Sequence, residues 1–294
     1  MTNRKRNKAL AMLAGIGLLV AGCAAVAPNL PSITEGSAQP RDNGRIVWHD
    51  LLTNTPEESK RFYSELFGWE FERPGLGGPR GYELIRHNGR LIGGMVDSNL
   101  IREGENISQW ITVISVDDIN AATASVEREG GEILTPATDV GARGVLAVAT
   151  GSEGAVFAMV ETRDGDPAVY QPVTNGWLWN ELWTNDVAGS TTFYGNVLGY
   201  SVDDRQPEAA DVTYRIFTSG DSPRAGVLAN PFERERPVWV TSLRVEAPAA
   251  LAARVEALGG RIIVESSDRP TGGKVALVAG PSGAGVALQT WPLD

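Results

Sequence analysis

Apolar residues gather in short blocks along the chain, and the first of these blocks predicts a strand followed by a helix. Residues 46–52 have the apolar content of a strand. Thr55 and Pro56, with Glu58 at the capping-box position, are typical of a helix start. Apolar and aromatic residues then form a buried helical stripe up to Phe67, and Gly68 ends the helix.

The blocks that follow predict strands, another helix and more strands. Residues 82–85 and 91–96 flank an Asn-Gly dipeptide, which favours a β-hairpin. A strand at 110–116 precedes a helix that starts at Asp117-Asp118 and stops at Gly130-Gly131. Strands at 145–149 and 155–160 are joined by a glycine-rich turn. The order is therefore βαβββ, given twice.

An internal repeat shows that this whole arrangement occurs again. Residues 48–69 and 179–200 match at a constant offset of 131, and a second register at offset 129 covers the following block. The first register contains identities at eight positions: Trp48, Leu51, Thr53, Asn54, Ser59, Phe62, Tyr63 and Gly68. We therefore predict two tandem domains of α+β fold, at residues 45–162 and 176–293, joined by a linker at 163–175.

The N-terminus has the pattern of an export signal. Basic residues up to Lys8 precede an uninterrupted apolar and glycine run at 9–20, which is too short to span a bilayer. Residues 20–23 (Val-Ala-Gly-Cys) resemble the lipobox of bacterial lipoproteins, in which the cysteine is lipidated. We expect a signal peptide at 1–22, a lipidated Cys23 and a flexible, proline-containing tether over 23–43. An ordinary signal peptide or an uncleaved anchor is the alternative. The expected location is the bacterial cell envelope, with the body in the periplasm or extracytoplasmic space.

Composition narrows the possible partners. The chain has 294 residues and a formal net charge of -10, which argues against nucleic-acid binding. Cys23 is the single cysteine, so neither an intramolecular disulfide nor a thiolate metal cluster can form within one chain.

The paired βαβββ units resemble the vicinal oxygen chelate superfamily, which includes glyoxalase I, extradiol dioxygenases and bleomycin-resistance proteins. The resemblance rests on Phe62-Tyr63 and Phe193-Tyr194, each followed by the end of its helix, and on closing turns at 151–155 and 280–284. It implies that each domain is a curved mixed sheet with helices outside. Fold does not fix the reaction, so the resemblance leaves the chemistry open.

In the metalloenzymes of this superfamily, His or Glu side chains on the first and last strands bind a divalent metal. The resemblance places these positions at tryptophan or aliphatic residues in both copies: Trp48, Trp110 or Ile111, Ala158, Trp179, Trp239 or Val240, and Ala287. Indole and methyl groups offer no lone pair to a cation. We therefore expect no metal site of the family's type and no cofactor.

Two equivalent acids, Asp50 and Glu181, lie two residues after their tryptophans and should share the concave face. They are the candidate catalytic residues, and the alternative is a structural carboxylate at a strand end. His49 alternates away from this face and matches Asn180, which favours a packing or surface role.

The aromatic residues suggest a binding cavity. The expected ligand-binding set comprises Trp48, Asp50, Trp110, Trp179, Glu181 and Trp239, although packing alone would also explain the tryptophans. Three functions follow. The first is a metal-free small-molecule-binding protein on a membrane tether. The second is a divalent-metal-dependent lyase or dioxygenase with an altered ligand set. The third is an envelope protein whose domains only form an interaction surface. The sequence leaves the ligand, any catalysis and the oligomeric state open.

Overall fold

The computed structural model describes residues 29–75, 78–205, 214–232, 235–269 and 272–290. The predicted signal peptide and Cys23 lie outside these residues. None of the described helices is long and apolar enough to cross a membrane.

The first domain contains the two predicted βαβββ units. In chain order its elements are β1 (Ile46–Thr53), α2 (Pro56–Phe67), β2 (Glu70–Glu72), β3 (Tyr82–His87), β4 (Arg90–Asp97), β5 (Gln109–Ser115), α3 (Ile119–Arg128), β6 (Glu132–Asp139), β7 (Gly144–Thr150) and β8 (Val156–Thr162). The strands form one mixed sheet in the order β2-β3-β4-β1-β5-β8-β7-β6.

The second domain repeats this topology. Its elements are β9 (Trp177–Thr184), α4 (Val187–Leu198), β10 (Ser201–Arg205), β11 (Tyr214–Ser219), β12 (Ser222–Ala229), β13 (Val238–Arg244), α5 (Pro248–Val255), β14 (Arg261–Asp268), β15 (Lys274–Ala279) and β16 (Gly285–Gln289). The sheet order is β10-β11-β12-β9-β13-β16-β15-β14, so the equivalent strands hold equivalent places. The predicted α+β fold with two copies is confirmed.

Most local predictions hold, with one exception at a helix start. Gly68 ends α2 in the left-handed conformation (φ 74°), and Asp118 accepts hydrogen bonds from the first backbone N–H groups of α3. Thr55 precedes α2, but its side chain makes no capping bond. Instead the Thr53 hydroxyl accepts from the Thr55 N–H and pairs with Ser59.

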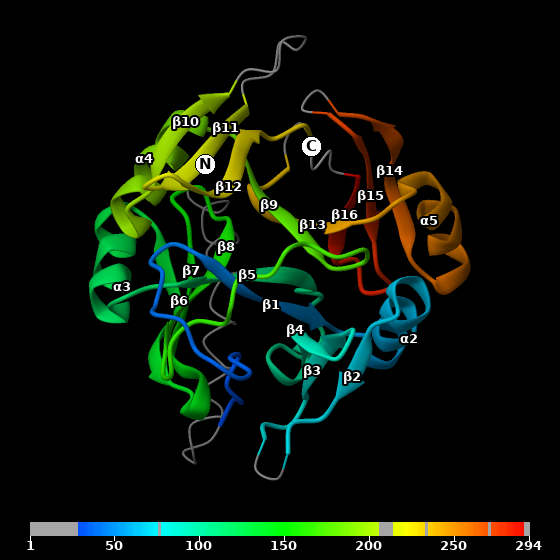
Figure 1. Ribbon diagram of the computed structural model, residues 1–294, viewed down its shortest axis with the longest axis horizontal. Coiled ribbons are helices and arrows are strands. Elements are labelled where there is room, and N and C mark those ends of the chain that lie inside the picture. Colours follow the sequence, from blue (N-terminus) through cyan, green and yellow to red (C-terminus); the bar gives the residue numbers. More distant parts are fainter. Residues whose placement is uncertain (1–28, 76–77, 206–213, 233–234, 270–271, 291–294) are drawn as a thin grey trace, which may run out of the picture.

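The helices of the two domains pack in pairs across the domain boundary. In Figure 1, α3 lies beside α4 on one side of the molecule and α2 beside α5 on the other. Each pair covers a hydrophobic core that draws side chains from both domains. The domains therefore share two cores, in addition to the separate interior of each curved sheet.

The repeated Phe-Tyr motifs and glycines meet at this boundary. A side chain on Gly260 would collide with Phe62 of α2, and one on Gly280 would press on Tyr63. Gly131 and Gly151 stand in the same relation to Phe193 and Tyr194 of α4. The repeated motifs therefore reflect close packing between the domains. Each aromatic ring of one domain lies against a glycine of the other, where any larger residue would place a Cβ in its way.

Equivalent residues of the two copies also meet directly. His49 on β1 hydrogen-bonds through Nε2 to Asn180 Oδ1 on β9 at 2.9 Å, and these two positions correspond in the repeat. His49 is buried and lies 4.4 Å from Trp177, ring centroid to ring centroid. Burial lowers the pKa of His49 to about 4, so the ring is neutral at pH 7. The packing role predicted for His49 is confirmed.

The residues before β1 pack on the first domain. Leu30 and Ile33 contribute to the core inside its curved sheet, and the Leu30 N–H donates to the Val140 carbonyl at 2.8 Å. Gln39 forms a backbone bridge with Asp166. The prediction of a flexible tether is therefore wrong for residues 29–43. Proline and small residues dominate that segment, but Leu30, Ile33 and backbone hydrogen bonds dock it on the domain while residues 35–41 stay exposed.

Candidate functional site

The concave face of each domain carries the acid that the sequence singles out. Asp50 and Glu181 lie on the central strands β1 and β9, and both are largely buried (side chains 13% and 7% exposed). The tyrosine and arginine partners of these acids were not predicted from the sequence. Each carboxylate contacts a tyrosine, an arginine and a tryptophan within the same domain.

In the first domain, Asp50 Oδ1 accepts hydrogen bonds from Trp48 Nε1 (2.9 Å) and the Tyr82 hydroxyl (2.8 Å). Arg143 donates through Nη2 to the Tyr82 oxygen at 2.8 Å and places Nη1 3.5 Å from Asp50 Oδ2. Arg143 is only 1% exposed, and its guanidinium lies over the ring of Trp48. The charged pair is thus buried, with tyrosine and tryptophan groups around it.

In the second domain, Glu181 Oε1 accepts from the Tyr214 hydroxyl (2.9 Å) and from Arg269 Nη2 (2.5 Å). Trp183 Nε1 donates to Glu181 Oε2 at 3.1 Å, and Trp179 Nε1 donates to the Tyr214 oxygen. Burial, more than any neighbouring charge, raises the pKa of Tyr214, as it does that of Tyr82. Both phenols therefore remain protonated donors.

A glycine in the neighbouring strand makes room for each tyrosine. Gly94 is paired with Asp50 across β4 and β1, and Gly226 with Glu181 across β12 and β9. A Cβ on Gly94 would collide with the Tyr82 hydroxyl and the Asp50 carboxylate. Gly94 and Gly226 recur at an offset of 132, close to the offset of the repeat, so the sequence already marks them as equivalent. Arg143 and Arg269 lie 126 positions apart, which differs from the offsets of 129 and 131 that align the two copies, so the repeat does not reveal them as equivalent.

The residues at the family's metal positions do not fit a metal ion. The Trp48 and Trp179 indoles face the acid–tyrosine groups as donors, while Ala158 and Ala287 line the two sheet interiors. Among the described residues, no three His, Cys, Asp or Glu side chains come close enough together to hold a metal.

Trp110 and Trp239 do not point into the curved sheets. They belong to the cores shared with the helices, where each indole N–H donates to a tyrosine hydroxyl at 3.0 Å, Tyr63 and Tyr194 respectively. Their alternation along β5 and β13 turns Ile111 and Val240 inward instead. Both residues still line a cavity, which is referred to below as the larger cavity.

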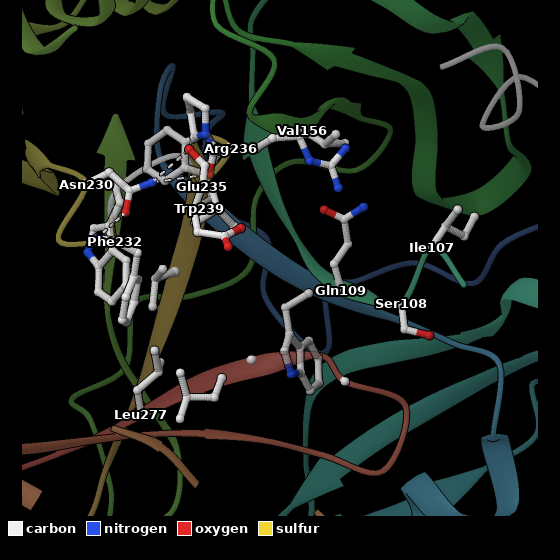
Figure 2. A pocket seen from close by; sticks show the side chains of 18 of the residues that line it. Ile107, Ser108, Gln109, Val156, Asn230, Phe232, Glu235, Arg236, Trp239 and Leu277 are labelled. Atoms are coloured by element: carbon white, nitrogen blue, oxygen red, sulfur yellow. Dashed lines mark hydrogen bonds between the residues drawn. The ribbon is translucent and has the colours of Figure 1, made fainter. Parts of the chain in front are cut away.

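The larger cavity has a volume of about 900 Å³ and opens from the interior of the second domain towards the first. Trp183 and Phe232 form an aromatic pair in it, with ring centroids 5.8 Å apart. Figure 2 shows Phe232, Glu235 and Arg236 on one side and Gln109 of the first domain on another. Its size lies within the range of small-molecule sites.

The smaller cavity, about 210 Å³, lies inside the first domain. Its walls are mainly aliphatic, and Leu30 of the N-terminal segment forms part of them. Its buried polar groups come from Asp50, Tyr82 and Thr135. Of the expected ligand-binding residues, Asp50 lines this cavity, Trp110 and Trp239 line the larger one, and Trp48, Trp179 and Glu181 line neither.

Comparison with known proteins identifies the family. The model of the Glyoxalase/Bleomycin resistance protein/Dioxygenase superfamily matches residues 45–165 and 176–288. The putative glyoxylase CFP32 of Mycobacterium tuberculosis is 30% identical over 82% of this chain and 92% of its own length. The anthracycline biosynthesis protein DnrV of Streptomyces peucetius is 29% identical over 83% and 92%.

Solved structures agree on the fold. The Mn(II)-bound glyoxalase from Novosphingobium aromaticivorans superimposes with a TM-score of 0.57 at 16% identity, covering 86% of this chain and 83% of that one. The 2,3-dioxygenase LapB from Pseudomonas gives a TM-score of 0.56 at 14% identity, covering 86% and 94%.

Proposed function

The chain belongs to the Glyoxalase/Bleomycin resistance protein/Dioxygenase superfamily, and we propose that within it this protein binds a flat aromatic small molecule with polar groups at its edge, without a metal. The observation that carries this proposal is the chemistry of the family's metal positions. Tryptophan and alanine occupy the first-strand and last-strand positions in both domains, and neither side chain offers a lone pair.

The acids beside these positions are already engaged. Asp50 and Glu181 each accept two or more hydrogen bonds from side chains of their own domain and face an arginine. Recruiting either carboxylate to a cation would leave a buried guanidinium without its counter-charge, which is costly. This favours binding without a metal over the metal-dependent alternative.

The ligand class follows from the larger cavity. Trp183 and Phe232 offer aromatic faces to a planar molecule, and charged and amide side chains of the same cavity, among them Arg236, can bind polar groups at its edge. The relative named for anthracycline biosynthesis is consistent with a polycyclic aromatic ligand.

A titration tests this function. An anthraquinone bearing a hydroxymethyl group should quench tryptophan fluorescence saturably, and Phe232→Ala should weaken its binding about tenfold. Leu100→Ala, at the equivalent position of the first domain, is the matched control and should leave binding unchanged. Stoichiometric Mn, Fe, Ni or Zn in the purified protein would contradict the metal-free proposal, and unsaturable quenching would contradict the cavity assignment.

We also propose that the protein is held at a membrane through lipidated Cys23. Leu30 is docked on the first domain and lies seven positions after Cys23, with six residues between them. Fully extended, the chain from Cys23 to Leu30 spans about 25 Å. The body would therefore stay within that distance of the bilayer. Lipid labelling in cells tests this, with Cys23→Ala as the variant that should release the protein from the membrane fraction.

A further inference from the structure

Exposed apolar side chains are concentrated in the linker between the domains. Five large apolar side chains are exposed among the described residues, and three of them, Val169 (75%), Tyr170 (52%) and Val173 (42%), lie within five consecutive positions. These three residues are called the linker patch below. Residues 167–175 contain no charged side chain, although the chain as a whole is acidic. Apolar side chains that gather at one place on a surface indicate a contact site.

The linker is held in a fixed position by its main chain. Arg244 donates through Nη1 to the Pro172 carbonyl at 2.8 Å, and His87 donates through Nε2 to the Thr174 carbonyl at 2.9 Å. These bonds satisfy backbone groups of the linker and leave the side chains of the linker patch facing solvent. The patch is therefore an ordered surface that needs no rearrangement before it meets a partner.

The β3–β4 hairpin contacts both the linker patch and the N-terminal segment. Arg90 places its guanidinium 4.2 Å from the centre of the Tyr170 ring. The next residue, Leu91, donates its N–H to the Glu35 carboxylate at 3.0 Å. The patch and the segment that leads back to Cys23 therefore border the same hairpin.

The length of chain before this segment limits how far the hairpin can lie from a membrane anchor. Glu35 follows Cys23 by twelve positions, which span at most about 40 Å when fully extended. Docking of Leu30 on the first domain shortens this reach further. A lipid on Cys23 would thus keep the hairpin, and the linker patch beside it, close to the bilayer surface.

The chemistry of the linker patch suits the interface of a bilayer. A tyrosine ring favours this region because its apolar face is buried while its hydroxyl stays hydrated. Arg90, beside the ring, can extend its guanidinium to a lipid phosphate. Three side chains are too few to hold a free protein on a membrane. An anchored protein meets the bilayer at a high effective concentration, so a small patch is enough to orient it.

We propose that Val169, Tyr170 and Val173 contact the interfacial region of the membrane to which Cys23 is attached, and so fix the orientation of the body on the bilayer. This inference rests on the proposed attachment at Cys23. It does not depend on the ligand of the larger cavity.

Chemical labelling of Tyr170 tests the contact. The mature protein, which begins at Cys23, is coupled through that cysteine to a maleimide lipid in phosphatidylcholine vesicles, so the test does not need lipidation in cells. The water-soluble reagent p-diazobenzenesulfonate modifies exposed tyrosines, and the five tyrosines other than Tyr170 are buried. We expect labelling of Tyr170 to be several-fold slower on vesicles than in solution with Cys23 blocked. Equal labelling in the two states would overturn the proposal.

Val202→Tyr is the matched control, because it adds a tyrosine at another exposed valine. Val202 lies on β10 at the upper edge of Figure 1, whereas the β3–β4 hairpin lies in the lower half. The introduced tyrosine should be labelled equally on vesicles and in solution. Its protection to the same extent as Tyr170 would overturn the proposal, since the bilayer would then shield the body without a preferred orientation.

A double variant tests whether the apolar side chains cause the protection. Val169→Ser combined with Val173→Ser should restore labelling of Tyr170 on vesicles, and both positions are exposed, so the fold should persist. Undiminished protection in this variant would overturn the proposal. Protection that rises with protein concentration in the absence of vesicles would also overturn it, and would assign the linker patch to a second copy of the chain. Lipid labelling in cells tests the attachment at Cys23 separately.

Discussion

The interiors of the two domains have the same strand order and the same central acid, but different residues cover that acid. In the first, Leu30 and Ile33 from the N-terminal segment join the core, and a cavity of about 210 Å³ remains over Asp50. In the second, Trp183 covers Glu181 and a cavity of about 900 Å³ opens above it.

This comparison separates what the duplication preserved from what it changed. The acid, tyrosine and arginine at the centre of each sheet are retained, and so are the glycines that let the tyrosines approach. The change from Leu52 to Trp183 alters the polarity of the cavity wall. A shared scaffold can thus present two different surfaces to ligands.

The largest expected effect concerns the buried arginines. Arg143→Met should destabilise the protein by about 3–5 kcal/mol, because it leaves the Asp50 carboxylate buried without its counter-charge. Arg269→Met should cost less, about 1–3 kcal/mol, since Glu181 keeps a donor on each carboxylate oxygen, whereas both remaining donors of Asp50 go to Oδ1. Urea unfolding measures both, with Arg128→Met on the exposed face of α3 as the control. Equal losses would show that the two clusters are energetically alike.

Acidification should lower the stability of the fold through His49, because its counterpart Asn180 does not titrate. The folded pKa of about 4 lies below the ordinary value of 6.5, so between these pH values the unfolded chain binds a proton that the folded chain does not. The His49 contribution is fully present above pH 6.5 and falls as the pH drops towards 4, by on the order of 3 kcal/mol. In the His49→Asn variant, the unfolding free energy should depend less steeply on pH across this range. An unchanged slope would place the acid sensitivity elsewhere.

Loosening the start of the N-terminal segment should act mainly on the first domain, because Ile33 packs in its core, whereas Asp42 and Asn43 at the end of the segment contact the second domain. Ile33→Ala removes a side chain that is 3% exposed and should cost about 2–3 kcal/mol. Hydrogen exchange should show faster exchange at the Leu30 and Gln39 amides, whose partners are Val140 and Asp166. Ser37→Ala, in the exposed part of the same segment, is the control. Unchanged exchange at Leu30 would mean that Ile33 does not hold the segment.

The smallest effect is expected at the aromatic wall. Trp183→Leu removes one face of the aromatic pair and should weaken anthraquinone binding about tenfold, with a loss of about 1 kcal/mol in stability because Glu181 Oε2 also loses its indole donor. Fluorescence or calorimetric titration measures this change. Tighter binding would show that the indole obstructs the cavity.

The fold was readable from the sequence because its signals are local and occur twice. Gly68, Asp118 and the Asn88-Gly89 turn act through their own backbone conformation or nearest neighbours, and the structure bears out each of them. Strand alternation puts Asp50 and Glu181 on the face of Trp48 and Trp179, and the family resemblance identifies that face as the concave one.

The partners of these acids could not be read in this way. Arg143 and Arg269 reach the acids from the segments around the third strands of their units, and loops of different length shift them out of register. Trp110 and Trp239 were assigned to the binding set because they are aromatic, yet the pleat turns them towards the helices. Burial of the N-terminal segment depends on tertiary contacts that composition does not reveal.

The hydrogen bond between His49 and Asn180 joins two equivalent positions near the axis that relates the domains. Had the copies been separate subunits of a homodimer, this residue would meet itself and would need to be self-complementary. Covalent fusion removes that requirement. One copy can then supply a titratable ring and the other a fixed amide. Two identical subunits could not place different residues at these equivalent positions.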